Sequence, residues 1–363
     1  MINLKEEHSK FVKLYSFSSG ATSPTSIKLV EEMISHLDEE IFKNPNSKFL
    51  DPCAGTGTFG VVLYDKLLKY HDSKWILKKM IFMVDTSLLK YDLLKKLGFV
   101  NVYNEDSNKI NFNMEFDWIG GNPPFSSTSK EPVRLWASFI EHNNKRLKKA
   151  GKLQFVTPST WMSSTNSVYD LLKDKIEYVN VADYVSKSFG STGGSQKFVY
   201  FIANKEHSSK CITKFDGGVE LEFNPTNTPI APIKSSSYFI FDLVEKLYNS
   251  NLPIFEWNRF DKIENSSGVI VPMAKAASYE VEFHKVDDFE IGRYKVNVDE
   301  TLGKIISKNL NTKTYQILRW VLRSGPALAG NFKLLPIPNT LMNDDELLDY
   351  LDMSTDAKNF IKS

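Results

Sequence analysis

The chain has 363 residues, enough for two domains, and its 42% hydrophobic and 25% charged residues are ordinary for a globular protein. Its net charge is only +1, with 26 basic against 22 acidic residues in 1–203 and 19 against 22 in 204–363. This balance argues weakly against a protein that coats nucleic acid, but it permits a local basic face. The two cysteines, Cys53 and Cys211, lie too far apart for a disulfide framework or a zinc cluster.

Targeting and membrane signals are missing from the pattern. The first ten residues have no apolar core of a signal peptide, and no apolar run approaches the roughly 20 residues that span a bilayer. The six histidines are scattered, without a pair at metal-ligand spacing. We therefore expect a cytoplasmic protein with no membrane partner and no metal.

Taken in chain order, apolar spacing predicts strands that alternate with helices over the first 203 residues. The predicted helices lie at 27–36, 58–71, 88–98 and 132–149. The predicted strands lie at 49–50, 80–85, 101–106, 116–121, 153–158, 178–185 and 196–203. Such alternation predicts an α/β fold with a doubly wound, Rossmann-like parallel sheet.

The pattern changes after Ala203. The polar stretch 205–210 looks like a linker, and turns, scattered strands and helical stretches at about 236–249 and 311–323 follow. We therefore expect a first domain of residues 1–203 and a second, mixed α+β domain of residues 204–363.

The first candidate site follows the strand at 49–50. Gly55 and Gly57 lie on the turn into the next helix, where glycine lets the backbone bend sharply and approach a ligand. Asp51 at the strand end disfavours a pyrophosphate and suits a cationic amino group, such as that of S-adenosylmethionine. Asp85 ends the next strand at a spacing suited to ribose hydroxyls. The simpler alternative is a tight turn, with Asp85 capping the following helix.

The second candidate site is the loop Asn122-Pro123-Pro124-Phe125, which follows the strand at 116–121. The prolines stiffen the loop and leave carbonyl acceptors exposed, and Asn122 adds a side-chain acceptor. Two such acceptors can hold both hydrogens of an amino group and direct its lone pair at an electrophile, while Phe125 offers a surface on which an extruded base can stack. A rigid turn with an Asn cap and a core Phe is the structural alternative.

These motifs resemble those of the DNA N6-adenine methyltransferases. DPCAGTG (51–57) matches the cofactor motif of that family and GNPPF (121–125) its catalytic motif. The resemblance implies that S-adenosylmethionine is the cofactor and duplex DNA the substrate. It also assigns the cofactor contacts within these motifs, which are Asp51, Pro52, Ala54, Gly55 and Gly57 for the methionine part, Asp85 for the ribose and Asp106 for the adenine ring. Asn122 and Pro123 would orient the target amine, and Phe125 would stack on the base.

Flanking segments extend the resemblance. The stretch 19–34 is similar to the N-terminal motif of the family, which places Thr22, Ser23 and Pro24 at the cofactor, although a Ser-Pro pair stands where the family has Thr-Pro. The stretch 151–162 is similar to the motif that lines the far side of the target pocket. The stretch 188–202 resembles the segment whose aromatic residue packs against the target base, which points to Phe189.

Motif order identifies the chain as similar to the gamma subclass. Only 65 residues separate Gly57 from Asn122, too few for an inserted DNA-reading domain, so residues 204–363 are expected to read the target. A cognate restriction endonuclease that acts separately is a further candidate partner.

Further nucleic-acid contacts are predicted from basic residues. Lys148 and Lys149 belong to a basic run at the expected end of the helix 132–149, where a solvated helix end is the simpler explanation. In the second half, Arg323 is the better candidate, because core packing explains Trp320 more simply. Two rival functions remain open, an RNA N-methyltransferase with the same loop and a non-catalytic nucleic-acid binder that retains the fold.

Overall fold

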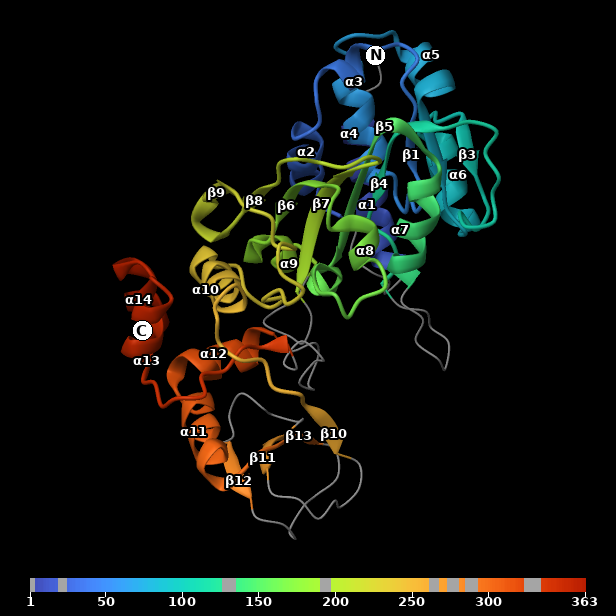
Figure 1. Cartoon of the computed structure of the whole chain (residues 1–363). Helices are drawn as coiled ribbons and strands as arrows, with labels where there is room; N and C mark the ends of the chain where they lie inside the picture. Colours follow the sequence, from blue (N-terminus) through green and yellow to red (C-terminus); the bar gives the residue numbers. More distant parts are fainter. Residues whose placement is uncertain are drawn as a thin grey trace.

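The computed structural model describes residues 4–18, 25–125, 135–189, 197–260, 268–272, 281–284, 293–322 and 334–363. Within these residues a nine-stranded sheet has the strand order β3-β2-β1-β4-β5-β7-β6-β8-β9. It occupies the upper part of Figure 1, with helices on both faces. The five neighbouring strands β3, β2, β1, β4 and β5 are parallel, and β7 is antiparallel to its neighbours β5 and β6. The predicted parallel sheet is therefore mixed. This is a doubly wound, Rossmann-like sheet.

The elements of this part follow the expected alternation. Its strands are β1 (Phe49–Asp51), β2 (Ile81–Val84), β3 (Asn101–Tyr103), β4 (Phe116–Gly121), β5 (Leu147–Pro158), β6 (Ile176–Asn180), β7 (Phe198–Asn204), β8 (Ile212–Lys214) and β9 (Glu220–Glu222). Its helices are α1 (Leu4–Ser18), α2 (Ile27–Ser35), α3 (Glu40–Lys43), α4 (Thr58–Leu67), α5 (Ser73–Trp75) with a π-helical turn (Ile76–Met80), α6 (Leu88–Lys96), α7 (Leu135–Lys145), α8 (Tyr169–Leu172) and α9 (Asp183–Lys187).

Two hydrophobic cores cover the two faces of the sheet. Neighbouring strand residues alternate between them, because successive side chains of a strand point to opposite faces. Phe49 and Trp118 belong to the core beneath α2 and α4, whereas Leu50 and Ile119 belong to the core that includes Trp136 of α7. Burial on both faces explains why the strands are continuous apolar runs in the sequence.

Two predicted elements were wrong in type or extent. The strand expected to reach residue 185 ends at Asn180, and residues 183–187 form α9. The helix expected to reach Lys149 ends at Lys145, and Lys148 and Lys149 lie in β5. Strand β5 begins early because Leu147 pairs with Phe116 at the start of β4. Long-range strand pairing therefore overrides the local helical spacing.

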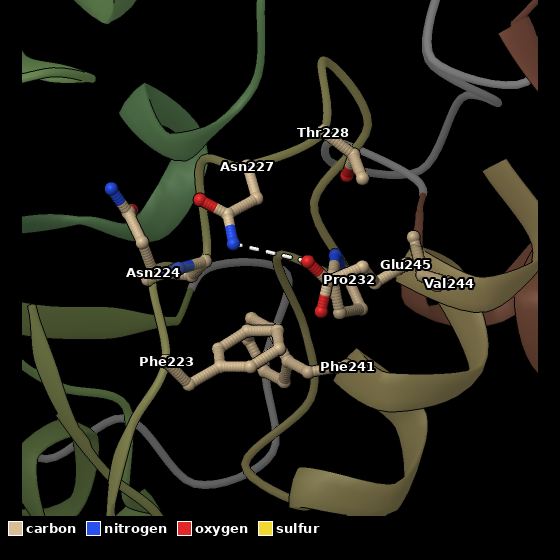
Figure 2. A pocket seen from close by; sticks show the side chains of 9 residues that line it. Phe223, Asn224, Asn227, Thr228, Pro232, Phe241, Val244 and Glu245 are labelled. Atoms are coloured by element: carbon tan, nitrogen blue, oxygen red, sulfur yellow. Dashed lines mark hydrogen bonds between the residues drawn. The ribbon is translucent and has the colours of Figure 1, made fainter. Parts of the chain in front are cut away.

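The sheet continues past the domain boundary expected near residue 204. Strand β8 pairs with β6, with Ile212 opposite Tyr178, and β9 pairs with β8. Helix α10 (Tyr238–Tyr248) then packs onto this part, and the ring centroids of Phe223 and Phe241 lie 6.1 Å apart, edge to face. Figure 2 labels both residues. Both residues line a cavity of about 10 Å³, which has room for one water molecule at most. The sequence-based boundary therefore falls inside the sheet.

The C-terminal part is mixed α+β and lies below the large sheet in Figure 1. Its antiparallel sheet has the order β10-β13-β11-β12. Its elements are β10 (Asn258–Phe260), β11 (Gly268–Pro272), β12 (Glu282–His284), β13 (Arg293–Asn297), α11 (Glu300–Leu310), α12 (Lys313–Val321), α13 (Asp344–Tyr350) and α14 (Thr355–Lys362). A separate core joins its helices, with Ile306, Leu318, Leu347 and Ile361 all buried. Among all the described helices, none has the length and apolarity needed to cross a membrane.

Candidate cofactor and target-base site

Asp51 and the turn that follows it form the first half of the site. Gly55 and Gly57 have φ angles of 56° and 90°, in the left-handed region that favours glycine. Asp51 is 2% exposed, and its Oδ1 accepts a hydrogen bond from the Cys53 N–H at 3.1 Å. Its Oδ2 is buried without a hydrogen-bond partner. Burial of a carboxylate oxygen without a donor is costly, so this atom is placed to receive a cationic group.

Asp85 at the end of β2 holds this turn in place. Its Oδ2 accepts the Gly55 N–H at 2.8 Å and its Oδ1 accepts the Ser87 N–H at 2.9 Å. Lys90 Nζ lies 3.7 Å from Oδ2. Because each carboxylate oxygen has a second lone pair, hydroxyl groups of a ribose can still bind there. Asp85 thus combines a structural role at the turn with the predicted position beside a ligand.

Asn122 follows the end of β4, beside β1. Its Nδ2 donates to Thr25 Oγ1 at 3.1 Å, and its Oδ1 is buried without a partner. Thr25 thereby orients the amide so that its oxygen is an available acceptor. Gly121 allows this loop to approach Asp51, because a Cβ at that position would lie 2.7 Å from Asp51 Oδ1 and 3.1 Å from Cys53 Sγ. The two unpartnered oxygens therefore belong to neighbouring strand ends.

Three phenylalanine rings form an aromatic group next to this loop. Phe125 lies 4.5 Å from Phe198, and Phe189 lies 5.8 Å from Phe198, measured between ring centroids. The structure thus brings together Phe125 and Phe189, which are 64 positions apart in the sequence. Phe125 and Phe189 are both partly exposed, so their rings can also contact a ligand. Pro123 is buried and Pro124 is exposed in the same loop.

The remaining predicted cofactor residues lie around the turn or outside the described part of the chain. Pro52 and Ala54 belong to the turn, and the Ala54 N–H donates to the Val84 carbonyl at 2.8 Å. Asp106 follows β3, and its Oδ1 accepts the Asn108 N–H at 3.0 Å. Thr22, Ser23 and Pro24 lie outside the described residues.

Lys148 and Lys149, which are predicted to contact DNA, lie in strand β5 and not at the end of a helix. Both lie near the start of β5, at the edge opposite to the carboxyl ends that carry Asp51 and Asn122. Lys148 Nζ contacts both carboxylate oxygens of Asp117, at 3.0 and 2.8 Å. Lys149 Nζ lies 3.6 Å from Glu206. Arg323 lies outside the described residues.

Trp320 was expected in the core but is 45% exposed. Lys234 Nζ lies 5.4 Å over its ring, a cation–π arrangement. The carbonyl of the preceding residue, Ile233, accepts a hydrogen bond from Ser159 Oγ, and the Ser159 N–H donates to the Lys197 carbonyl at 2.9 Å. Residues 233 and 234 thus contact both Trp320 and Ser159, and Ser159 contacts the residue before β7.

Sequence reasoning missed two residues of the site. Thr25 follows the motif at 22–24 directly, but nothing in the pattern pairs it with Asn122, which is 97 positions away. Phe198 stands at the centre of the aromatic group, and in the sequence it is one of several aromatic residues of a buried strand.

An open depression of about 600 Å³ lies between the loop 108–115 and the end of α7. It contains none of the residues predicted for the cofactor or the target base. Within the described residues no cluster of three or more histidine, cysteine or acidic side chains could hold a metal ion.

Parts of the chain are similar to a known family model and to solved structures. Residues 30–187 match the family model described as Methyltransferase small domain. No curated protein sequence matches the chain. Similar solved structures include a protein named as the modification subunit of a type I restriction enzyme from Vibrio vulnificus YJ016, with 15% identity and a TM-score of 0.45 over 58% of this chain and 53% of that chain.

Two further structures have comparable similarity. One is named as a class I S-adenosylmethionine-dependent methyltransferase from Listeria monocytogenes, with 15% identity and a TM-score of 0.44 over 58% of this chain and 72% of that one. The other is a type I restriction-modification methyltransferase subunit from Streptococcus thermophilus, with 16% identity and a TM-score of 0.38 over 56% and 50%. The chain thus spans about half the length of the Vibrio and Streptococcus proteins. Similarity at this level does not assign an activity.

The site combines three chemical features at the carboxyl ends of β1, β2 and β4. A buried carboxylate oxygen is available for a cation, a neighbouring acid is placed for hydroxyl groups, and an amide oxygen is available for an amine. Residues of this kind fit the ammonium and ribose groups of S-adenosylmethionine. The aromatic group beside Asn122 fits a planar ring that carries an amine.

Proposed function

We propose that the chain is an S-adenosylmethionine-dependent methyltransferase that acts on the N6 amino group of adenine in a specific duplex DNA site. The observation that carries the proposal is the pair of buried, unpartnered oxygens, Asp51 Oδ2 and Asn122 Oδ1, on neighbouring strand ends. The first is suited to the ammonium group of the cofactor and the second to the amine of the target. One site would therefore hold both reactants of a methyl transfer.

Asp51, with the turn Gly55–Gly57, would bind the methionine part of the cofactor, and Asp85 would bind its ribose. When bound, S-adenosylmethionine supplies a methyl group activated by the positive sulfonium. The residues Pro52, Ala54 and Asp106, together with Thr22, Ser23 and Pro24, complete the proposed cofactor contacts. Their contribution is binding and orientation.

The target adenine would leave the duplex and stack on Phe125. Phe189 would lie behind it, as a member of the same aromatic group. Asn122 Oδ1 and the Pro123 carbonyl would each accept one hydrogen of the amine, which fixes the direction of its lone pair. Held in this way, the lone pair of the amine would face the methyl group that the cofactor supplies, and the proton lost by the amine would pass to water. Positioning would supply most of the acceleration, because no side chain has to remove a proton before the transfer.

The C-terminal part would read the DNA site. Trp320 and Lys234 present an exposed aromatic ring with a cation over it, which suits contact with a nucleic-acid strand. Because β8, β9 and α10 pack with the sheet, we place the start of this reading domain after α10. A restriction-modification system, with an endonuclease that acts separately, is the proposed setting.

Transfer of labelled methyl from S-adenosylmethionine to unmethylated duplex DNA, with digestion to nucleosides, tests the proposal. We expect N6-methyladenine from the wild type and none from Asn122→Ala, while calorimetry shows cofactor affinity unchanged in that variant. Label on RNA alone would replace the substrate by RNA. Cofactor binding without transfer to either nucleic acid would favour a non-catalytic binder.

A further inference from the structure

A polar cluster joins helix α2 to the part of the sheet that carries the aromatic group. At its centre Glu32 Oε1 accepts hydrogen bonds from Lys214 Nζ at 2.9 Å, from the Tyr200 hydroxyl at 2.9 Å and from Asn180 Nδ2 at 3.1 Å. The Tyr184 hydroxyl donates to the same oxygen. Donors from β6, β7, β8 and α9 therefore converge on one carboxylate of α2.

The cluster is too polar to be explained by stability alone. Asn180 and Tyr200 are fully buried, and the Glu32 and Lys214 side chains are only 24% and 21% exposed. Burial acts to raise the pKa of Glu32, but the hydrogen bonds from Tyr184, Lys214 and Tyr200 outweigh it and lower the pKa, so the carboxylate is ionised at neutral pH. Replacement of a buried ion pair by apolar side chains of similar volume is often neutral or stabilising. What the charged cluster adds is a defined geometry.

That geometry reaches Phe189 through α9. Tyr184 belongs to α9, and the helix is also fixed by Ser186, whose Oγ accepts the Phe198 N–H at 2.8 Å. The Phe189 N–H donates to the Ser186 carbonyl at 3.1 Å, which places the ring of Phe189 beside that of Phe198. The Glu32–Tyr184 bond therefore holds the short helix α9, which ends two residues before Phe189.

The same helix α2 touches the catalytic loop at its other end. Thr25, just before α2, accepts the hydrogen bond from Asn122 Nδ2, and Ser26 caps the helix by accepting the Leu29 N–H at 3.3 Å. Seven positions separate Thr25 from Glu32, about 10 Å along a helix. One rigid element thus contacts the amine-holding residue at one end and the support of Phe189 further along.

We propose that Glu32 is a positioning residue for the target base. Glu32 holds α9 through Tyr184, and α9 holds Phe189 in the aromatic group at a fixed distance from Asn122. This role rests on the proposed function, because the proposed function supplies the target base that the aromatic group would contact. It predicts that loss of the Glu32–Tyr184 bond loosens α9 and weakens the use of DNA, while the cofactor half of the site is unaffected.

Two variants of the full chain test this role, Glu32→Gln and Tyr184→Phe, with Glu31→Gln as the matched control. Glu31 neighbours Glu32 on α2 but pairs with Lys5 of α1 at 2.9 Å. Tyr184 is 37% exposed, so its conservative change should leave the fold intact even where the change at Glu32 does not. Amide hydrogen exchange of residues 183–189 and 58–67 reports the two halves of the site separately. Methyl transfer to unmethylated bacterial genomic DNA gives kcat and KM, and calorimetry gives the affinity for S-adenosylhomocysteine.

In both variants we expect faster exchange in 183–189 but not in 58–67, and kcat/KM for DNA about tenfold lower, the size expected for one hydrogen bond to a charged group. Affinity for S-adenosylhomocysteine should stay constant, and Glu31→Gln should match the wild type. Unchanged exchange in 183–189, unchanged kcat/KM for DNA, or an equal loss of cofactor affinity would each overturn the role of Glu32. A wild-type protein that methylates no DNA would instead overturn the proposed function, and the role of Glu32 with it.

Discussion

Asp51 should make cofactor binding depend on pH, because its carboxyl group titrates near neutrality. Burial raises the pKa of Asp51 to about 7 against the opposing hydrogen bond from the Cys53 N–H, and the charge of Asp85 adds to the rise. An ammonium group beside Oδ2 favours the ionised form. Below pH 7 the carboxyl group must therefore lose its proton before the cation can bind.

The sign and size of the effect follow from this proton. Above pH 7 the group is already ionised and the affinity for the cofactor is constant, whereas below pH 7 the affinity falls tenfold for each pH unit. Between about pH 7.5 and about pH 5.5 the dissociation constant should rise roughly 25-fold, or about 2 kcal/mol.

Titration calorimetry with S-adenosylhomocysteine, in buffers of different ionisation enthalpy, measures both the affinity and the protons released on binding. We expect release to approach one proton at the acidic end of this range. Asp51→Asn should weaken binding at neutral pH and flatten the profile. Asp117→Asn is the matched control, because that carboxylate pairs with Lys148 at the opposite edge of the sheet and should leave the slope unchanged.

Two results would show that this reasoning is wrong. One is an affinity that does not change with pH in a folded wild type. The other is an Asp51→Asn variant that keeps the wild-type slope, since another group would then carry the proton.

Three further changes test other parts of the site. Thr25→Val removes the acceptor of Asn122 Nδ2, so single-turnover methyl transfer should slow by about tenfold, the size expected for one hydrogen bond, at constant cofactor affinity. An unchanged rate would show that Asn122 needs no support from Thr25. Gly57→Ala would put a Cβ 2.5 Å from Leu94 Cδ2 at a φ of 90°, and urea unfolding should show a loss of about 1–3 kcal/mol; wild-type stability would contradict the strain. Trp320→Ala should weaken duplex binding about fivefold in fluorescence anisotropy, near 1 kcal/mol, and equal affinity would remove this ring from the DNA surface.

The sequence was sufficient for features that depend on neighbouring residues. Apolar runs and helical spacing located the strands β1, β2 and β4 and the helices α2, α4 and α6 close to their observed bounds. Parallel strands end at one edge of a sheet, so acids and an amide at the ends of those strands lie along the same edge. The structure places Asp51, Asp85 and Asn122 at that edge.

The sequence was not sufficient for features that depend on long-range contacts. Local spacing made Lys148 the end of a helix, but pairing with β4 put it in a strand. Local spacing also predicted that the sheet ends near residue 204, although β8 and β9 extend the sheet. Strands β8 and β9 have three residues each and, unlike the fully buried β1, are mostly not buried, so they form no apolar run and only their partners define them.

The support of the candidate site is likewise tertiary. Thr25 lies 97 positions from Asn122, and Glu32 lies 152 positions from Tyr184. Hydrogen bonds over such separations leave no periodic trace in the sequence, because each partner needs only to be polar and to arrive at the right place. The sequence by itself determined which chemical groups stand at the strand ends, and only the packing of α2 and α9 against the sheet decided how those groups are oriented and held.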